Sequence, residues 1–353
     1  MRSYRLEHFG APLVEQQSAT PAPVGREVVL QVGSCGVCHS DVHLADGYFD
    51  LGGGNRIDLT RSVAPPRTLG HEIAGTVVSI GPEVDGVAIG DKRVVYPWIG
   101  CGHCSLCLAG DEHLCNAPRA LGVTRDGGFA DHVLVPDAKY LFEYAPLSEE
   151  QACTYACSGL TAFSALKKVA SIGAKMNANE RLLIIGAGGV GLSGIRMAKS
   201  LGFAPPIVAE VDHGKWNIAR EAGAGEVIDP NADGASRALM KSSDGGLAAA
   251  IDFVGAGETF SFGFNALKKG GTLVSVGLFG GATSVSPASV AMKAVRIVGS
   301  YVGSLTEMRE LIELARDQSL PELPLTTFPL SAASDTLNAL KAGRVRGRAV
   351  LKP

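Results

Sequence analysis

The 353 residues include 32 Lys and Arg against 35 Asp and Glu, and only 19% of the residues are charged. The formal net charge of −3 and the absence of a basic cluster argue against binding to nucleic acid or to anionic lipid, so the expected partner is a small molecule. A chain of this length has room for two domains, each with its own core.

The first 150 residues predict a β-rich, antiparallel region. Short strand patterns separated by Gly, Pro and Asp occur at 26–32, 73–81, 92–98 and 129–136. An irregular, glycine-rich stretch lies between the first two patterns and ends at Leu69. This glycine-rich stretch is therefore expected to consist mainly of loops.

From Glu149 the pattern becomes helical and then alternates between strands and helix-length segments. The apolar run LLII precedes a tight glycine turn and a helix, and further strand patterns occur at 207–210, 226–229, 248–255, 271–278 and 295–301. This alternation predicts an α/β domain with a doubly wound parallel sheet. Two helical stretches and a basic terminal strand follow.

The N-terminal segment and the apolar runs of the chain bear on its compartment. The N-terminal segment lacks an apolar core, and the longest apolar runs are too short to span a bilayer. Eight cysteines are too few for a disulfide scaffold in so long a chain, and most of them lie in tight groups, which indicates metal binding in a reducing compartment. We therefore expect a cytoplasmic protein that does not associate with membranes.

Four cysteines form a C-x2-C-x2-C-x7-C array: Cys101, Cys104, Cys107 and Cys115. Four thiolates so close in sequence can surround one zinc ion, and such a closed site is structural. A disulfide pair or an iron–sulfur cluster is the alternative, but the array lacks the proline and the second cysteine group of iron–sulfur motifs. The array therefore predicts a structural zinc site.

A second motif, G-x-G-x-x-G, is formed by Gly186, Gly188 and Gly191 directly after a strand and directly before a helix. In this context the glycines allow a tight turn, close approach of the backbone to a pyrophosphate, and close packing of helix on strand. Glu210 at the end of the next strand is placed to accept hydrogen bonds from a ribose, with Asp212 as the alternative acid. These carboxylates would repel a 2′-phosphate, which favours NAD over NADP.

Further candidate ligands are Cys38, His71 and either Cys153 or Cys157. Three protein ligands with one open position are typical of catalytic zinc. Zinc there would act as a Lewis acid on an alcohol or carbonyl oxygen while a nicotinamide takes or gives a hydride.

Five segments, in this order, resemble the zinc-dependent alcohol dehydrogenases of the medium-chain dehydrogenase/reductase superfamily. They read GVCHSDVH, LGHEIAGTVVSIG, DKRVVYPWIGCGHCSLCLAGDEHLC, YACSGLTAFSAL and IIGAGGVGL. The resemblance implies a GroES-like catalytic domain over residues 1–157 and 303–353, and an NAD-binding Rossmann domain over residues 158–302. It also implies two zinc ions per subunit and a homo-oligomer, either a tetramer or a dimer.

The same resemblance assigns the catalytic residues. Cys38, His71 and Cys157 are the implied zinc ligands, because YACSGLT matches the segment of the family's third ligand; Cys153 is then a core residue. Glu72 lies behind the metal, and Asp41 orients His71. Ser40 and His43 form the implied proton relay.

Cofactor contacts are also implied by the resemblance. Thr161 and the segment from Val276 to Phe279 should line the nicotinamide. The full set of implied contacts outside the three motif glycines and Glu210 is His39, Thr161, Gly189, Val190, Lys215, Val254, Val276, Gly277, Leu278 and Arg348.

The implied reaction is reversible hydride transfer between a zinc-bound primary or secondary alcohol and NAD, which gives an aldehyde or ketone. A polyol or sugar dehydrogenase of the same superfamily and a catalytically silent NAD-binding regulator are the alternatives. Zinc-free quinone reductases lack the cysteine lobe and the Cys38 and His71 pair. One departure from the family is a segment of about ten extra residues within 46–69, which we expect to wall or cover the substrate pocket, with a contact between subunits as the alternative.

Overall fold

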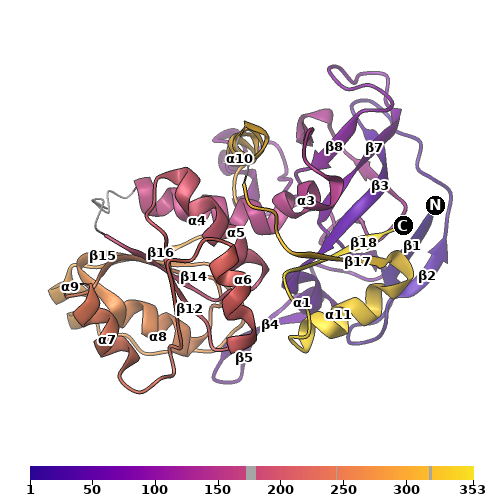
Figure 1. Ribbon diagram of the computed structural model, residues 1–353. Helices are drawn as coiled ribbons and strands as arrows, with labels where there is room; N and C mark the ends of the chain where they lie inside the picture. Colours follow the sequence, from indigo (N-terminus) through magenta and orange to yellow (C-terminus); the bar gives the residue numbers. More distant parts are fainter. Residues whose placement is uncertain (172–179, 244, 318–319) are drawn as a thin grey trace. The chain divides into compact units, whose positions relative to one another are not determined.

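The computed structural model of the protein describes residues 1–171, 180–243, 245–317 and 320–353 (Figure 1). The chain forms two compact units. The first unit comprises Met1–Tyr48, Asp58–Leu160 and Val302–Pro353, and the second comprises Phe49–Ile57 and Thr161–Tyr301.

A mostly antiparallel sheet with the strand order β10-β8-β7-β3-β18-β17 organises the first unit, and β9 pairs with β3. Strands β17 and β18, from the C-terminal end of the chain, complete the sheet beside β3 from the N-terminal part (Figure 1). The seven strands are β3 (Val28–Val37), β7 (Glu72–Ile80), β8 (Lys92–Val95), β9 (His132–Val135), β10 (Leu141–Glu143), β17 (Leu325–Pro329) and β18 (Arg348–Lys352).

The first unit also contains smaller elements. A second sheet, of order β2-β1-β6, contains β1 (Arg2–Leu6), β2 (Val14–Gln17) and β6 (Arg67–Thr68). The helices are α1 (His39–Asp46), α2 (Ser105–Leu108), α3 (Glu149–Thr154), α10 (Leu305–Asp317) and α11 (Ala333–Lys341), with 3₁₀ turns at Glu112–Leu114, Ala138–Tyr140 and Leu330–Ala332.

Helix α3 continues through a π-helical turn at Tyr155–Gly159 into α4 (Leu160–Ser171). Single π turns within α-helical segments are rare and often mark functional sites. The turn is buried throughout and includes Cys157.

The second unit contains a parallel sheet of order β13-β12-β11-β14-β15-β16. Its strands are β11 (Leu182–Ile185), β12 (Ile207–Ala209), β13 (Glu226–Ile228), β14 (Leu247–Asp252), β15 (Leu267–Ser275) and β16 (Arg296–Gly299). Its further helices are α5 (Gly189–Ala198), α6 (Trp216–Glu221), α7 (Ala235–Ser242), α8 (Gly257–Ala266) and α9 (Pro287–Lys293), with 3₁₀ turns at Lys199–Leu201 and His213–Lys215. The strand order reverses between β11 and β14, which is the dinucleotide-binding point of a doubly wound sheet. The predicted α/β fold class is confirmed.

A core of aliphatic and aromatic side chains holds the second unit together. It includes Leu183, Ile185 and Ile207 from the sheet and Phe262 and Phe264 from α8. The central strands β11 and β12 read as continuous apolar runs because both of their faces are buried, whereas the edge strand β16 is mostly exposed.

A two-stranded hairpin, β4 (Tyr48–Gly52) and β5 (Asn55–Asp58), arises from the segment that departs from the family. The sequence boundaries placed this hairpin in the first domain, but residues 49–57 pack with the second unit. Gly52 explains part of this packing, because a Cβ atom on it would lie 2.4 Å from the backbone nitrogen of Ala282.

Across the described residues, no helix is both long enough and apolar enough to cross a membrane.

Candidate functional site

Cys38, His71 and Cys157 converge in the interior of the first unit. One ligand atom from each lies within 4.8 Å of the others, and all three residues are buried. The sulfur atoms of Cys38 and Cys157 are 3.9 Å apart. Zinc–sulfur bonds of about 2.3 Å in a tetrahedron place two sulfur atoms about 3.8 Å apart, so the pair fits a shared zinc ion.

Each ligand comes from a different element. Cys38 follows β3 and caps α1, His71 directly precedes β7, and Cys157 lies in the π turn. Gly70 precedes His71 with φ of +89°, a conformation that favours glycine. The site is therefore assembled by the fold rather than by one local loop.

Asp41 connects two of the ligand segments. Its Oδ2 accepts a hydrogen bond from the backbone N–H of Cys38 at 2.9 Å, and its Oδ1 accepts one from Gly70 N–H at 3.2 Å. Oδ1 also lies 3.2 Å from Nδ1 of His71. Within the described parts of the chain, neither buried ring nitrogen of His71 makes a hydrogen bond of regular geometry; Nδ1 lies against Asp41, which leaves Nε2 as the nitrogen able to bind metal.

Electrostatics at this cluster favour a thiolate ligand. The hydrogen bond with Cys157 lowers the pKa of Cys38 well below the ordinary thiol value, burial opposes this change, and His71 lowers the pKa further. The same hydrogen bond, together with burial, raises the pKa of Cys157 well above the ordinary thiol value. Burial does the same to the pKa of Cys35 and of Cys153, so it is position rather than pKa that separates Cys157 from the two core cysteines. The Cys153 thiol donates to the carbonyl of Glu150 at 3.3 Å, and Cys153 lies outside the cluster.

Glu72 is fully buried beside the cluster. Its Oε1 accepts the backbone N–H of Ser158 at 3.0 Å, and its Oε2 pairs with the guanidinium of Arg348. Burial raises the pKa of Glu72, although the charge of Arg348 opposes that rise. A Cβ atom on Gly36 would lie 2.0 Å from Oε2, so glycine is required there. Sequence reasoning missed this ion pair, and it named Arg348 only as an implied cofactor contact.

The other residues of the implied relay follow Cys38 along α1. Ser40 and His43 are half-buried, and the rings of His39 and His43 lie 5.6 Å apart. Burial lowers the pKa of His43, which keeps its imidazole neutral and able to accept a proton near neutral pH. The relay stays a prediction.

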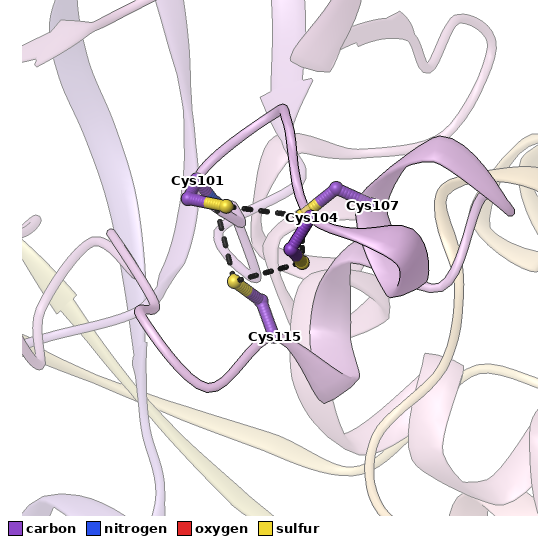
Figure 2. Close-up of side chains that lie close together, drawn as sticks. All are labelled: Cys101, Cys104, Cys107 and Cys115. Atoms are coloured by element: carbon purple, nitrogen blue, oxygen red, sulfur yellow. Dashed lines mark hydrogen bonds between the residues drawn. The ribbon is translucent and has the colours of Figure 1, made fainter.

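The four-cysteine array folds into a compact lobe around α2 (Figure 2). Its ligand sulfur atoms lie within 4.8 Å of one another, with separations of 3.9 Å for Cys101 and Cys107, 3.5 Å for Cys104 and Cys107, and 3.7 Å for Cys104 and Cys115. These distances match the edges of a zinc–thiolate tetrahedron. Backbone hydrogen bonds from His103 and Cys104 lower the pKa of Cys101 to about 6.

Glu112 anchors this lobe, and sequence reasoning missed it. Its carboxylate accepts hydrogen bonds from Tyr140 Oη at 2.6 Å, from Lys139 Nζ at 2.9 Å and from the backbone N–H of Gly100 at 3.2 Å. Gly100 directly precedes Cys101. The sequence around Glu112 gave little indication of this role, because an acidic residue in a polar stretch is normally expected at the surface.

In the second unit, the glycine motif forms the turn between β11 and α5. Gly186 has φ of +92°, and a Cβ atom on Gly191 would lie 1.9 Å from the carbonyl oxygen of Gly186. At Gly188, which caps α5, a Cβ atom would meet nothing within 4 Å, so the backbone there is open to a phosphate group. Gly189 and Val190 begin the helix.

Glu210 follows β12 and holds the same turn. Its Oε2 accepts the N–H of Ala187 at 2.8 Å, and its Oε1 accepts the N–H of Asp212 at 2.8 Å. Asp212 caps the next turn through Gly214 N–H and lies 3.9 Å from Lys215 Nζ. Glu210 therefore has a structural role beside the predicted contact with ribose.

The remaining predicted cofactor residues of the second unit lie in three places. Val254 follows β14, the segment from Val276 to Leu278 follows β15, and Thr161 is buried near the start of α4. Val276 is buried, whereas Leu278 is 45% exposed. Their contacts with NAD stay predictions.

Comparison with known proteins agrees with this arrangement. Residues 25–146 match the family model "Alcohol dehydrogenase GroES-like domain", and residues 189–317 match "Zinc-binding dehydrogenase". A curated NAD-dependent alcohol dehydrogenase of Sulfurisphaera tokodaii is 36% identical over 355 residues, which cover 100% of both chains.

Two solved structures are also similar. An alcohol dehydrogenase of Aeropyrum pernix has a TM-score of 0.88 at 29% identity and covers 100% of both chains. A D-arabinose dehydrogenase of Sulfolobus solfataricus has a TM-score of 0.84 at 27% identity and covers 100% of this chain and 99% of the other. With its buried Cys₂His cluster, cysteine lobe and doubly wound sheet, the chain belongs to the zinc-dependent alcohol dehydrogenases of the medium-chain dehydrogenase/reductase superfamily.

Proposed function

We propose that the protein is an NAD-dependent alcohol dehydrogenase that interconverts primary or secondary alcohols with aldehydes or ketones and holds two zinc ions per subunit. The observation that carries this proposal is the buried cluster of Cys38, His71 and Cys157. Three protein ligands leave one position for substrate, whereas the four-cysteine lobe leaves none. When bound, zinc supplies Lewis acidity at that position, and NAD supplies a hydride acceptor.

The chain's own residues have separate tasks in this reaction. Asp41 holds the His71 ring and the Cys38 backbone, so the ligands are oriented before substrate binds. The hydroxyl of Ser40 takes the proton that the alcohol loses, and Nδ1 or Nε2 of His43 accepts it for transfer to water. The lowered pKa of His43 supports this role, because a neutral imidazole can accept a proton.

Glu210 and Asp212 support the choice of NAD. Both carboxylates lie at the end of β12, beside the glycine turn. A 2′-phosphate on the ribose would meet their negative charge, whereas ribose hydroxyls can donate hydrogen bonds to them. Activity with NADP should therefore be much lower than with NAD.

A sugar or polyol dehydrogenase is the second candidate, because the structurally similar protein of Sulfolobus solfataricus is a D-arabinose dehydrogenase. Polyol enzymes of this superfamily more often have a carboxylate as the third ligand, so Cys157 favours simple alcohols. A silent NAD-binding regulator is less well supported, because the zinc ligands and the relay residues are all present.

We also infer a cytoplasmic homo-oligomer, a tetramer or else a dimer. Edge strand β16 supports association, because its Ile297 side chain is 43% exposed. The thiol-rich metal sites support a reducing compartment.

The test is an absorbance assay at about 340 nm, the NADH band, with zinc-loaded protein and a panel of primary, secondary, aromatic and cyclic alcohols, polyols and aldoses. NAD-linked oxidation of apolar alcohols that chelation abolishes is the expected result. Preferred oxidation of aldoses would favour the second candidate. NAD binding without turnover on any substrate would favour the regulator.

A further inference from the structure

Asp252, at the carboxyl end of β14, binds the turn that follows it. The residue is fully buried, with 0% of its surface exposed. Its Oδ1 accepts the backbone N–H of Val254 at 2.9 Å and of Gly255 at 3.0 Å, and its Oδ2 accepts the hydroxyl of Thr259 at 2.9 Å. Burial raises the pKa of Asp252, although these donors oppose that rise. A buried carboxylate thus fixes the 253–255 turn.

The backbone of Asp252 also holds the segment after β15. Its carbonyl oxygen accepts the N–H of Val276 at 3.0 Å and of Gly277 at 3.0 Å. The turn and the segment are then joined directly, because the carbonyl of Val254 accepts the N–H of Phe279 at 3.1 Å.

The two stretches pack so closely that no side chain fits at Gly255. Gly255 has φ of +75°, and a Cβ atom on it would lie 1.9 Å from the carbonyl oxygen of Gly277. A displacement of the turn would therefore move the segment as well.

Sheet topology indicates which part of a dinucleotide meets these stretches. The strand order changes direction between β11 and β14, and a dinucleotide lies across that point. The glycine turn after β11 and Glu210 after β12 belong to the half that binds the adenosine and the pyrophosphate. The ends of β14 and β15 belong to the other half, where the nicotinamide nucleoside binds.

We propose that Asp252 is a positioning residue that aligns the 253–255 turn and the 276–279 segment for the nicotinamide end of the cofactor, without a part in binding the adenosine end. This inference rests on the proposed use of NAD. It differs from a purely structural role, in which loss of Asp252 would weaken binding of every part of the cofactor together.

The experiment compares binding of NADH and of ADP-ribose, which lacks the nicotinamide, by titration calorimetry of the zinc-loaded protein. Asp252→Ala removes the acceptor, Asp252→Asn keeps one acceptor oxygen for Val254 and Gly255, and Thr272→Val is the matched control. Thr272 is also fully buried, on the neighbouring strand β15, and its hydroxyl has no hydrogen-bond partner within the described residues.

In Asp252→Ala, the Kd for NADH is expected to rise about ten-fold or more, as for the loss of buried hydrogen bonds, while the Kd for ADP-ribose changes less than about two-fold. Asp252→Asn should retain most of the NADH affinity, and Thr272→Val should change neither constant. Equal losses for both ligands in Asp252→Ala, or no loss for either, would overturn the inference.

Two further measurements cover the cases in which the variant does not fold or the wild-type protein does not bind the ligands. If Asp252→Ala does not fold, Thr259→Val removes one donor to the same carboxylate and should shift the ratio of the two Kd values in the same direction by a smaller factor; an unchanged ratio would contradict the proposal. If the wild-type protein binds neither NADH nor ADP-ribose, the proposed function itself fails.

Discussion

The chain assembles its two cysteine centres in different ways. The four-cysteine lobe takes all its ligands from residues 101–115, and three of the four cysteines are partly exposed. The Cys38, His71 and Cys157 cluster is fully buried, and its two cysteines are 119 positions apart in the sequence. The ligands of the lobe are brought together by one short segment, whereas the ligands of the buried cluster come together only when the whole domain folds.

Because of this difference, we expect metal in the lobe to contribute to stability and metal in the buried cluster to contribute to the reaction. A closed site of four thiolates has no place for substrate, so its metal can act only on the fold around it. A buried site with three protein ligands can keep one position open, and its low-dielectric surroundings strengthen electrostatic effects on a bound oxygen. Substitutions in the two centres should therefore give opposite patterns of loss.

The largest effect is expected for Cys157→Ala. Activity should fall by about 10³-fold or more, the scale seen when a main electrostatic contribution to catalysis is removed. Elemental analysis should show loss of one zinc ion per subunit, with the lobe still loaded. Loss of both ions, or of neither, would contradict the assignment of the two centres.

Cys104→Ala should give the reverse pattern. The lobe should lose its zinc, and the free energy of unfolding should fall on the order of 4 kcal/mol, because loss of a bound metal is among the strongest single-site effects. Thermal denaturation and zinc analysis measure both changes. If folded Cys104→Ala protein also lacks zinc at the Cys38, His71 and Cys157 cluster, the two centres are not independent.

Asp41→Asn tests whether Asp41 orients the ligands of the buried centre. Because Asp41 holds His71 and the backbone of Cys38, zinc affinity at this centre should fall about 10- to 100-fold. Competition with a chelator measures the change, and the lobe provides an internal control. Equal weakening of both centres would indicate a general loss of stability instead.

Glu112→Gln is the corresponding change at the lobe, with a smaller expected effect. The amide keeps one acceptor oxygen but loses the charge that pairs with Lys139, so transfer of lobe zinc to a chelator should be about 3- to 10-fold faster, as for loss of a charge-assisted hydrogen bond. Lys139→Ala is the control, because its half-exposed ammonium should contribute less.

The pH dependence of stability gives the mildest test. Burial opposes the change, but hydrogen bonds from Tyr140 and Lys139 lower the pKa of Glu112 below its ordinary value. Its contribution to stability is thus present near neutral pH and is lost as the pH falls through the lowered pKa. Glu112→Gln should therefore lose less stability than wild type between pH 7 and pH 3 in chemical denaturation. Identical pH profiles would exclude this contribution.

The same contrast explains what could be predicted from the sequence. The lobe and the glycine motif are local, so spacing alone indicates them. For the buried centre, the residues themselves left Cys153 and Cys157 open as the third ligand, because helical spacing does not reveal a π turn. Resemblance to the family indicated Cys157, and the structure brings that residue into the cluster.

Other features required coordinates. The pair between Glu72 and Arg348 joins residues 276 positions apart, and no local pattern predicts such a contact. The hairpin of residues 49–57 lies in a stretch that belongs by sequence to the first domain, and only its packing, which includes close contacts with residues 280–282, assigns it to the second unit.

The π turn at Tyr155–Gly159 has a consequence for how this enzyme can change over time. A π turn is an α-helix with one residue too many, so deletion of a single residue would restore regular hydrogen bonding and a more favourable helix. The same deletion would rotate one flank of the helix by about 100° against the other and turn Cys157 away from its partners. Local stability and metal binding therefore select in opposite directions at this turn, and a chain that lost the reaction would be free to lose the extra residue.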